Sequence, residues 1–162
     1  MKLNDLTLEN TTHLYDKCDK WDFTQENEFD PVELEQYMLN LMKKENGIGL
    51  SANQIGLKRR VFTIKESKGP AYALFNPKIV SLGPNKTYTL EGCLSFKDHF
   101  VNVKRSDRVM ASFFTSKGKK VTKYYNGIDA KCFLHELDHL NGITFLRYEH
   151  DGDNTETGQK TI

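Results

Sequence analysis

Short runs with β-strand character fill the middle of the sequence, and a helical segment lies on either side of them. This arrangement constrains the fold more than any other feature. Strands that are grouped between helices, instead of alternating with them, are typical of an α+β domain with mostly antiparallel sheets. Gly and Pro signals help to separate the runs, which we place at residues 59–65, 71–77, 78–82, 86–92, 99–105, 108–116 and 120–125, with a hairpin turn at 117–120.

The two helical segments have recognisable ends. Asp30 predicts an N-cap, Pro31 suits the first turn, and Asn46-Gly47 predicts the end of the first helix. The second helix is expected to begin near Ile128 and to end at Asn141-Gly142. The core-facing stripe of the first helix is predicted to consist of Leu34, Met38, Leu41 and Met42.

The composition indicates one globular domain without a polyanionic partner. The chain has 162 residues, with 23 Lys plus Arg and 22 Asp plus Glu. Because the charges nearly balance, we expect no nucleic-acid binding. Residues 1–150 are predicted to form the single domain, and the polar residues 151–162 a flexible tail.

The sequence also favours a cytoplasmic protein, which we expect to be a monomer. The first residues, MKLNDLTLEN, lack the apolar run of a signal peptide, and no segment has the roughly 20 apolar residues of a membrane span. The three widely spaced cysteines are Cys18, Cys93 and Cys132. An odd number favours free thiols or a metal thiolate in a reducing compartment over a disulfide framework.

The segment His-Glu-Leu-Asp-His at residues 135–139 is a candidate metal site. His135 and His139 are four residues apart, so in a helix their imidazoles lie on one face about one turn apart. Glu136 lies beside that face and can accept a proton from a water that a metal activates. The pattern is short enough to arise by accident, and it leaves the third ligand of a catalytic metal unidentified.

The arrangements typical of HExxH metallopeptidases do not supply this third ligand. Phe145 stands where a third histidine would follow, and the downstream acids lie in or beside the polar tail. Cys132 is seven residues before His139, roughly 10 Å along a helix at about 1.5 Å per residue. We therefore expect Cys132 to be a small wall residue under the site. Cys93 remains, although a buried structural cysteine is the commoner explanation of such a residue taken alone.

Two further motifs accompany the histidine segment. GIGLSANQ at residues 47–54 belongs to a loop that we predict at residues 47–56. It combines glycines that expose backbone groups with Gln54, an amide donor suited to a developing oxyanion. EGCLS at residues 91–95 contains Cys93. In this order and spacing, the three motifs resemble the GxGLAAxQ, EGCLS and HExDH motifs of the peptide deformylases, from residue 31 to about residue 147. The resemblance implies a fold of mostly antiparallel sheets packed around a central helix that bears HExxH.

The resemblance implies a hydrolase that removes the N-formyl group from the initiator methionine of nascent polypeptides, which it would meet at the ribosome. Metal-bound hydroxide would attack the formyl carbon, with Glu136 as general base and then general acid. Gln54 and the backbone N–H of Leu94 would stabilise the oxyanion. An HExxH metallopeptidase is the alternative function. The resemblance implies one divalent metal, Fe²⁺ in the cell with Ni²⁺, Co²⁺ or Zn²⁺ as alternatives, held by Cys93, His135 and His139.

The resemblance also implies how a substrate would bind. Its backbone would add as a strand beside Ile48 and Gly49, with Gly92 opposite. The methionine side chain would enter an apolar pocket whose walls include Ile48, Ile128 and Cys132. A recurrent arginine of the family corresponds to Arg105, which would pair with Glu91 and brace the cysteine loop.

The sequence departs from the family pattern at several positions. Ser51 replaces the commoner alanine of the first motif, and we expect little change from it. Lys131 stands where an apolar residue usually borders the methionine pocket, and no proline follows EGCLSF. Only a polar tail follows the second predicted helix, in place of the long C-terminal helix of many members. In this respect the chain resembles the short forms carried by phages.

Overall fold

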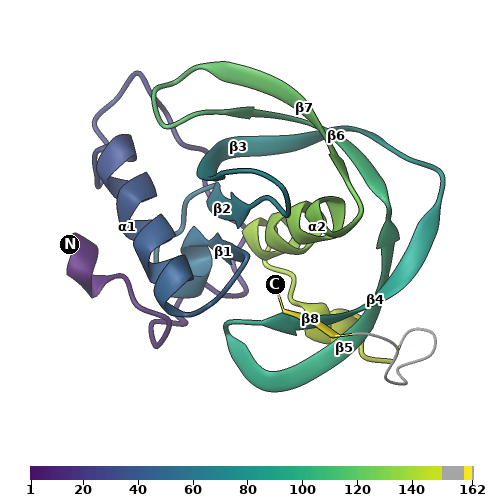
Figure 1. Ribbon diagram of the computed structural model, residues 1–162. Helices are drawn as coiled ribbons and strands as arrows, with labels where there is room; N and C mark the ends of the chain where they lie inside the picture. The colour runs from purple at the N-terminus through teal and green to yellow at the C-terminus, as the bar shows by residue number, and fades with distance from the viewer. Residues whose placement is uncertain (151–158, 162) are drawn as a thin grey trace.

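Two sheets and two α-helices make up the computed structural model of the protein, which describes residues 1–150 and 159–161 (Figure 1). The helices are α1 (Pro31–Lys44) and α2 (Ile128–Leu140), and short 3₁₀ turns occur at η1 (Leu3–Asp5), η2 (Ala52–Ile55) and η3 (Phe145–Tyr148). The strands are β1 (Gly49–Ser51), β2 (Val61–Lys65), β3 (Ala71–Leu82), β4 (Lys86–Cys93), β5 (Phe96–Ser106), β6 (Arg108–Phe114), β7 (Lys120–Asn126) and β8 (Gln159–Thr161).

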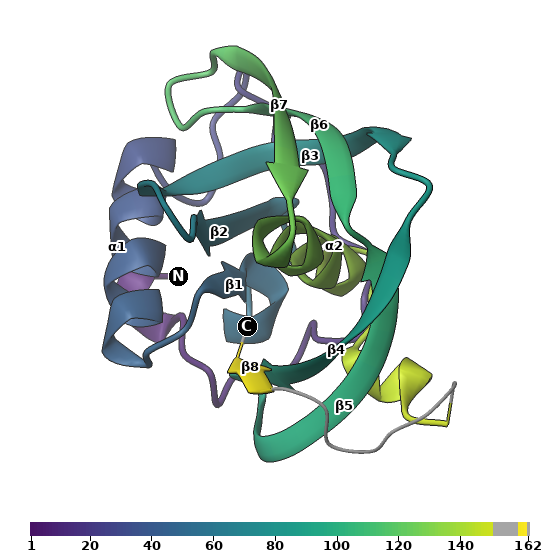
Figure 2. The same cartoon turned by 45° about the vertical axis from the view of Figure 1, so that its right-hand side comes forward.

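The strands form a larger sheet in the order β1-β2-β3-β6-β7 and a smaller sheet in the order β5-β4-β8. Neighbouring strands are antiparallel except for β4 and β8. α2 lies between the two sheets, and α1 packs against the β1, β2 and β3 end of the larger one (Figures 1 and 2). The predicted α+β class with mostly antiparallel sheets is confirmed.

The first helix begins where its local chemistry predicts. The Asp30 carboxylate accepts hydrogen bonds from the backbone N–H groups of Val32 and Glu33 at 2.9 and 3.1 Å. Pro31 takes the first position, where a missing N–H costs nothing. Of the predicted stripe only Leu41 is partly exposed, and the buried residues are Leu34, Met38 and Met42.

Residues 71–82 form one strand, β3, where the sequence predicted two. The register with β6 shifts around Asn76 and Pro77. Asn76 has a left-handed φ of 51°, and Pro77 lacks an N–H, so the ladder is interrupted and the strand bulges instead of ending. The Asn76 amide also exchanges two hydrogen bonds of 2.8 Å with the backbone of Trp21, so the bulge anchors the N-terminal segment.

An apolar core joins α2 to the larger sheet. The Phe133 ring on α2 lies 5.4 Å from the ring of Phe62 on β2 and 5.4 Å from that of Tyr125 on β7, measured between centroids. All three side chains are buried. Burial of a side chain of this size contributes about 1.5–3 kcal/mol, so this contact holds α2 on the sheet.

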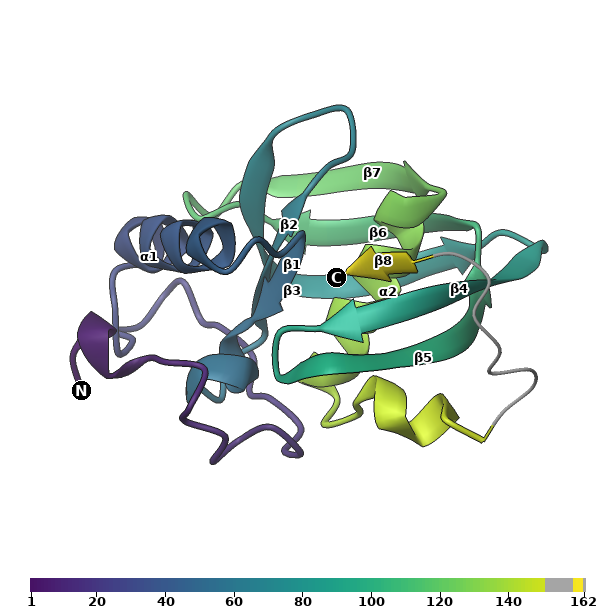
Figure 3. The ribbon, with the colours of Figure 1, turned by 60° about the horizontal axis from the view of Figure 1, so that its bottom comes forward.

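The smaller sheet is built on a long ribbon of β4 and β5 beside α2 (Figure 3). The two strands pair without interruption from Lys86 with Ser106 to Glu91 with Val101. The register then shifts before Cys93 pairs with Phe96. Such an irregularity changes the direction in which a side chain points, and here it precedes a predicted metal ligand.

The predicted flexible tail lies outside the described residues for 151–158 and 162. Residues 159–161 form β8, which pairs with the edge of β4, so here the structure has a strand instead of a flexible segment. Strand pairing depends on backbone groups, so a polar sequence can satisfy the open edge of β4 as well as an apolar one. Neither described helix is long and apolar enough to cross a membrane.

Candidate metal centre and active site

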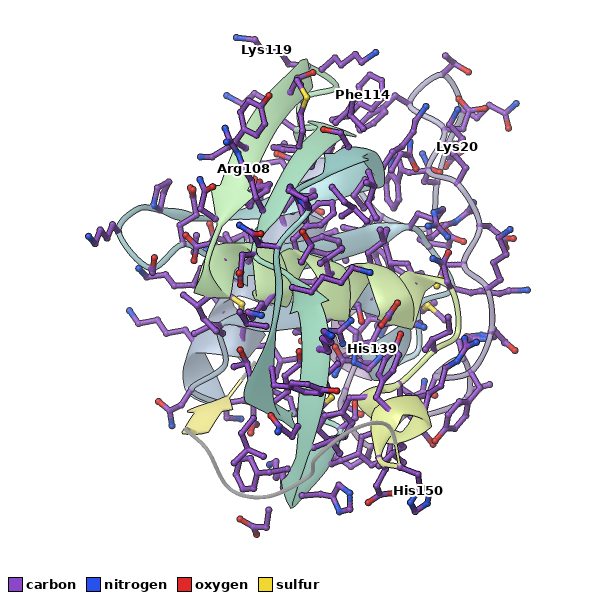
Figure 4. All side chains as sticks on the ribbon, turned by 90° about the vertical axis from the view of Figure 1, so that its right-hand side faces the viewer. Lys20, Arg108, Phe114, Lys119, His139 and His150 are labelled. Carbon is purple, nitrogen blue, oxygen red and sulfur yellow. The ribbon has the colours of Figure 1, made fainter. Side chains whose placement is uncertain are left out.

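Helix α2 presents two imidazoles on one face. His135 and His139 are both buried on α2, and their ring centroids are 4.9 Å apart. Figure 4 shows His139 in the interior of the molecule, whereas His150 lies at the periphery. α2 ends at Leu140, and Gly142 follows with a left-handed φ of 74° that suits glycine. This stop leaves His139 in the last turn of the helix.

Cys93 reaches the histidines from the end of β4. Its Sγ lies 3.4 Å from Nε2 of His139. One ligand atom from each of Cys93, His135 and His139 lies within 4.8 Å of the others, and all three residues are buried. The structure therefore brings the three predicted ligands together, although the cysteine and the histidines come from different elements.

The donor atoms fit a divalent metal ion. Nε2 of the buried His135 has no hydrogen-bond partner among the described residues, whereas its Nδ1 lies 2.8 Å from Glu91. A carboxylate on Nδ1 fixes the tautomer and leaves Nε2 available to a metal. Burial, and next His135, lowers the pKa of His139 well below its usual value, so its imidazole is neutral. One sulfur and two nitrogens are a donor set for Zn²⁺ or Fe²⁺.

The surroundings of the Cys93 thiol favour a bound cation. Burial, and then the charge of Glu136, raises its pKa to about 12. A thiolate in this position is unfavourable without a positive charge beside it, and a coordinated divalent ion supplies that charge. The raised pKa of Cys93 and the short distances among the three side chains thus both indicate a bound divalent ion.

A buried ionic network holds the smaller sheet on α2. Arg105 on β5 donates to both carboxylate oxygens of Glu91, at 2.6 and 3.1 Å, which confirms the predicted pair. Its third contact is with Asp138 on α2, at 2.8 Å, and Tyr148 donates to the same Asp138 oxygen at 2.9 Å. Burial opposes the ionisation of Glu91, but Arg105 and the bond to His135 hold its pKa below the usual value.

Glu136 is placed for proton transfer beside the ligands. Its Oε1 lies 3.8 Å from Nε2 of His135. Burial, and then the neighbouring Glu91, raises the pKa of Glu136 well above its usual value, which suits a group that both accepts and donates a proton near neutral pH. Gly49 on β1 faces it closely, because a Cβ there would lie 2.9 Å from both Glu136 Oε1 and Cys132 Sγ.

Gln54 is fixed against the cysteine loop. Its Oε1 accepts hydrogen bonds from the backbone N–H and the hydroxyl of Ser51, both at 2.9 Å. Its Nε2 therefore points toward the cysteine loop and lies 2.9 Å from Ser95 Oγ and 3.6 Å from Cys93 Sγ. Leu94, between these two residues, is buried. An amide donor thus lies directly beside the predicted metal ligand.

The three comparisons with known proteins agree with this geometry. The family described as polypeptide deformylase matches residues 4–154. The chain belongs to the peptide deformylase family. A peptide deformylase of Thermotoga petrophila is 38% identical over 109 residues, which are 67% of this chain and 66% of that protein.

Solved structures of peptide deformylases share the fold. The class I type b enzyme of Acinetobacter baumannii with bound Met-Ala-Ser has a TM-score of 0.76 and 28% identity, over 83% of this chain and 90% of that chain. A probable peptide deformylase of Synechococcus phage S-SSM7 has a TM-score of 0.75 and 32% identity, over 83% of this chain and 92% of that chain. The family therefore agrees with the sequence motifs, and one of these similar structures comes from a phage.

In this member of the peptide deformylase family, Cys132 lies apart from the three ligands. Its Sγ donates to the backbone C=O of Ile48 at 3.4 Å, and burial, followed by Glu136, raises its pKa well above the usual value. The thiol is therefore protonated and bonded to the glycine segment. Ile128, partly buried, lies one helical turn before it, and Ile48 is partly buried as well. The predicted wall residues Ile48, Ile128 and Cys132 are thus near one end of α2.

Gly49 lies in a strand instead of an open loop, whereas Gly92 lies in a strand as the sequence predicted. Sequence reasoning expected a loop at residues 47–56, but Gly49 begins β1 and pairs with Ile64 of β2. Gly92 lies in β4 and is buried. The correction follows from β2, because its hydrogen-bonding edge draws the residues after α1 into a strand.

Sequence reasoning missed the part played by Lys131. Lys131 is buried, with 4% of its surface exposed. Its ammonium donates to the backbone C=O and the hydroxyl of Thr87, both at 2.8 Å. It also donates to the backbone C=O of Arg105 at 3.3 Å and lies 3.4 Å from Asp107. The charge is therefore bound to the β4–β5 ribbon. A lysine on the buried face of a helix is the signal that indicates such a partner.

Two other polar side chains support the centre without any motif role predicted for them. Ser51, for which we expected little consequence, orients Gln54 through its hydroxyl. Asn53 donates to the backbone C=O of His139 and so ties the end of α2 to η2. Both residues lie within GIGLSANQ, so the motif positions more than its glycines and glutamine.

Proposed function

We infer that this chain is a metal-dependent hydrolase that removes the N-formyl group from the initiator methionine of nascent polypeptides. One observation carries the inference: the ligand atoms of Cys93, His135 and His139 lie within 4.8 Å of one another, beside the buried Glu136. Membership of the peptide deformylase family supports the same activity.

We assign the metal to these three side chains, which leave a fourth position for water or substrate. A divalent ion bound there would polarise the formyl carbonyl and lower the pKa of a water molecule. The thiolate would donate negative charge to the ion and temper its Lewis acidity compared with a site of three histidines. Soft and borderline ions suit this donor set.

The chain's own residues would then move the proton and stabilise the charge. Glu136, with its raised pKa, would take a proton from the attacking water and deliver it to the leaving amine. The Gln54 amide, held by Ser51, would donate to the developing oxyanion together with the backbone N–H of Leu94. The fixed orientation of Gln54 supports this role, because a preorganised donor loses little entropy during the reaction.

The substrate backbone would lie between β1 and β4. Ile48 and Gly49 border one side, and Gly92 borders the other. A side chain at Gly49 would collide with Glu136 and Cys132, so glycine keeps this approach open. The methionine side chain would lie against Ile48, Ile128 and Cys132. The Lys131 ammonium is bound to Thr87, so its positive charge does not enter this pocket, and the pocket would be apolar.

Several expectations from the sequence stay predictions. They are Fe²⁺ as the cellular metal, a monomeric state, a cytoplasmic location and an encounter with the peptide at the ribosome. The division into a catalytic domain of residues 1–150 and a tail stays a prediction as well. Ni²⁺, Co²⁺ and Zn²⁺ would fit the same donors. Metal analysis of anaerobically purified protein distinguishes these ions.

Formate release from formyl-Met-Ala-Ser tests the activity. The Ni²⁺-loaded protein should release formate, and Glu136→Gln should lower kcat by about 10²- to 10⁴-fold because the proton-transfer group is lost. Metal content measured on the same samples controls for loss of the ion. If the protein releases no formate but cleaves the peptide bonds of unformylated Met-Ala-Ser, it is a metallopeptidase instead.

A further inference from the structure

β8 lies on the open edge of β4. Gln159 pairs with Leu90, Lys160 with Glu91 and Thr161 with Gly92, in a parallel register. In all three ribbon views β8 lies on the side of β4 that faces β1 (Figures 1, 2 and 3). A segment close to the end of the sequence therefore lies in the gap between β4 and β1.

This edge of β4 is the one that a substrate strand would need. The opposite edge of β4 is paired with β5 from Lys86 to Glu91 and again at Cys93. A peptide that adds beside Gly92 can therefore bind only where β8 lies. Since Gly92 pairs with Thr161, a docked β8 and a bound substrate backbone exclude each other.

We propose that Gln159–Thr161 is an internal competitor that occupies the substrate position on β4 and must leave before a formylated peptide binds. The proposal rests on the proposed function for the position of the substrate, but the docking of β8 itself does not depend on catalysis. The occupant is this chain's own segment, because β8 is covalently joined to the strand it pairs with.

The expected strength of this competition is modest. β8 has only three residues, and each backbone hydrogen bond contributes little net stability after its bonds to water are replaced. Covalent attachment to the same chain raises the effective concentration of a segment to about the millimolar range. Weak contacts at this concentration give an edge that is occupied for much of the time and still open to a substrate. We therefore expect an effect on KM and none on kcat.

Paired substitutions in the full chain separate backbone pairing from side-chain effects. Lys160→Pro combined with Thr161→Pro removes two successive N–H groups, which point to opposite sides of a strand, so that one of them faces β4. The matched control, Lys160→Ala combined with Thr161→Ala, loses the same side chains and keeps both N–H groups. With formyl-Met-Ala-Ser and Ni²⁺-loaded protein, the proline variant should show a KM about two- to tenfold lower, with unchanged kcat. The alanine variant should keep the original KM.

Equal KM values for the proline and alanine variants would overturn the proposal. So would a KM that depends on protein concentration, because the occupant would then be the segment of a second copy. Amide hydrogen exchange gives a readout that needs no activity. The amides of Leu90–Gly92 that face away from β5 should exchange about two- to tenfold more slowly in the unaltered chain than in the proline variant. If no variant releases formate but this protection is lost as expected, the proposed function fails and the docking of β8 stands.

Discussion

The two sheets hold α2 in different ways. The larger sheet meets the helix through apolar side chains, with Phe133 packed between Phe62 and Tyr125. The smaller sheet meets it largely through charged groups, with Glu91 on His135 and Arg105 on Asp138, both at 2.8 Å. One interface depends on burial and the other on directed hydrogen bonds.

This difference explains how a site assembled from two elements keeps its geometry. Apolar burial is non-directional, so it holds α2 on the larger sheet without fixing each side chain. Hydrogen bonds between charged groups are directional and stronger than neutral ones. Since Cys93 comes from β4 and His135 and His139 come from α2, the separation of the three ligands depends on the ionic interface.

Arg105→Ala should have the largest effect. It leaves Glu91 buried and without its cationic partner, which should lower the free energy of unfolding by about 3–5 kcal/mol. Metal content should fall as well, because Glu91 would no longer be held on His135. Urea denaturation and metal analysis measure the two effects. Lys97→Ala is the control, since it breaks an exposed pair with Glu45 and should cost less than about 1 kcal/mol.

Phe133→Ala should weaken the apolar interface without reaching the metal ligands. A cavity between Phe62 and Tyr125 should lower the free energy of unfolding by about 3–5 kcal/mol. The folded fraction should still bind metal, because the ligands are held by the ionic interface. If Phe133→Ala removes the metal as completely as Arg105→Ala does, the apolar interface also positions the ligands, and the two interfaces do not have separate roles.

Lys131→Met should have the smallest effect of the three on the free energy of unfolding. The substitution keeps the length of the side chain but leaves the Thr87 carbonyl without the ammonium that it accepts from. The free energy of unfolding should fall by about 1–3 kcal/mol. Metal content should stay unchanged, since Lys131 contacts none of the ligands. A loss of metal in folded Lys131→Met protein would show that the β4–β5 ribbon needs this lysine to present Cys93.

The sequence predicted most of the elements because their signals are local. Asp30 caps α1, and the spacing of His135 and His139 places both on one helical face. The turn at residues 117–120 closes the β6–β7 hairpin through a 2.8 Å hydrogen bond from the Thr115 N–H to the Lys119 C=O. The three motif ligands were also predicted, through their resemblance to a family.

Features that depend on distant partners were not predicted. The bulge at Asn76 depends on Trp21, which is far away in the sequence, and the pairing of β8 with β4 depends on an edge that no local pattern reveals. The bonds of Lys131 have the same cause, because Thr87 approaches it only in the folded chain. Local patterns therefore predicted the elements, the family resemblance predicted the ligands, and tertiary contacts decided what supports them.

The metal content of two cysteine variants tests most directly whether both interfaces build one site. Cys93→Ser removes a ligand that β4 supplies, whereas Cys132→Ser alters a thiol on α2 that bonds to Ile48. After anaerobic loading with Ni²⁺ and removal of free ion, the original protein and Cys132→Ser should each retain about one ion per chain, and Cys93→Ser close to none. Full retention by Cys93→Ser, or loss from Cys132→Ser with Cys93 intact, would contradict the assignment of the third ligand to the smaller sheet.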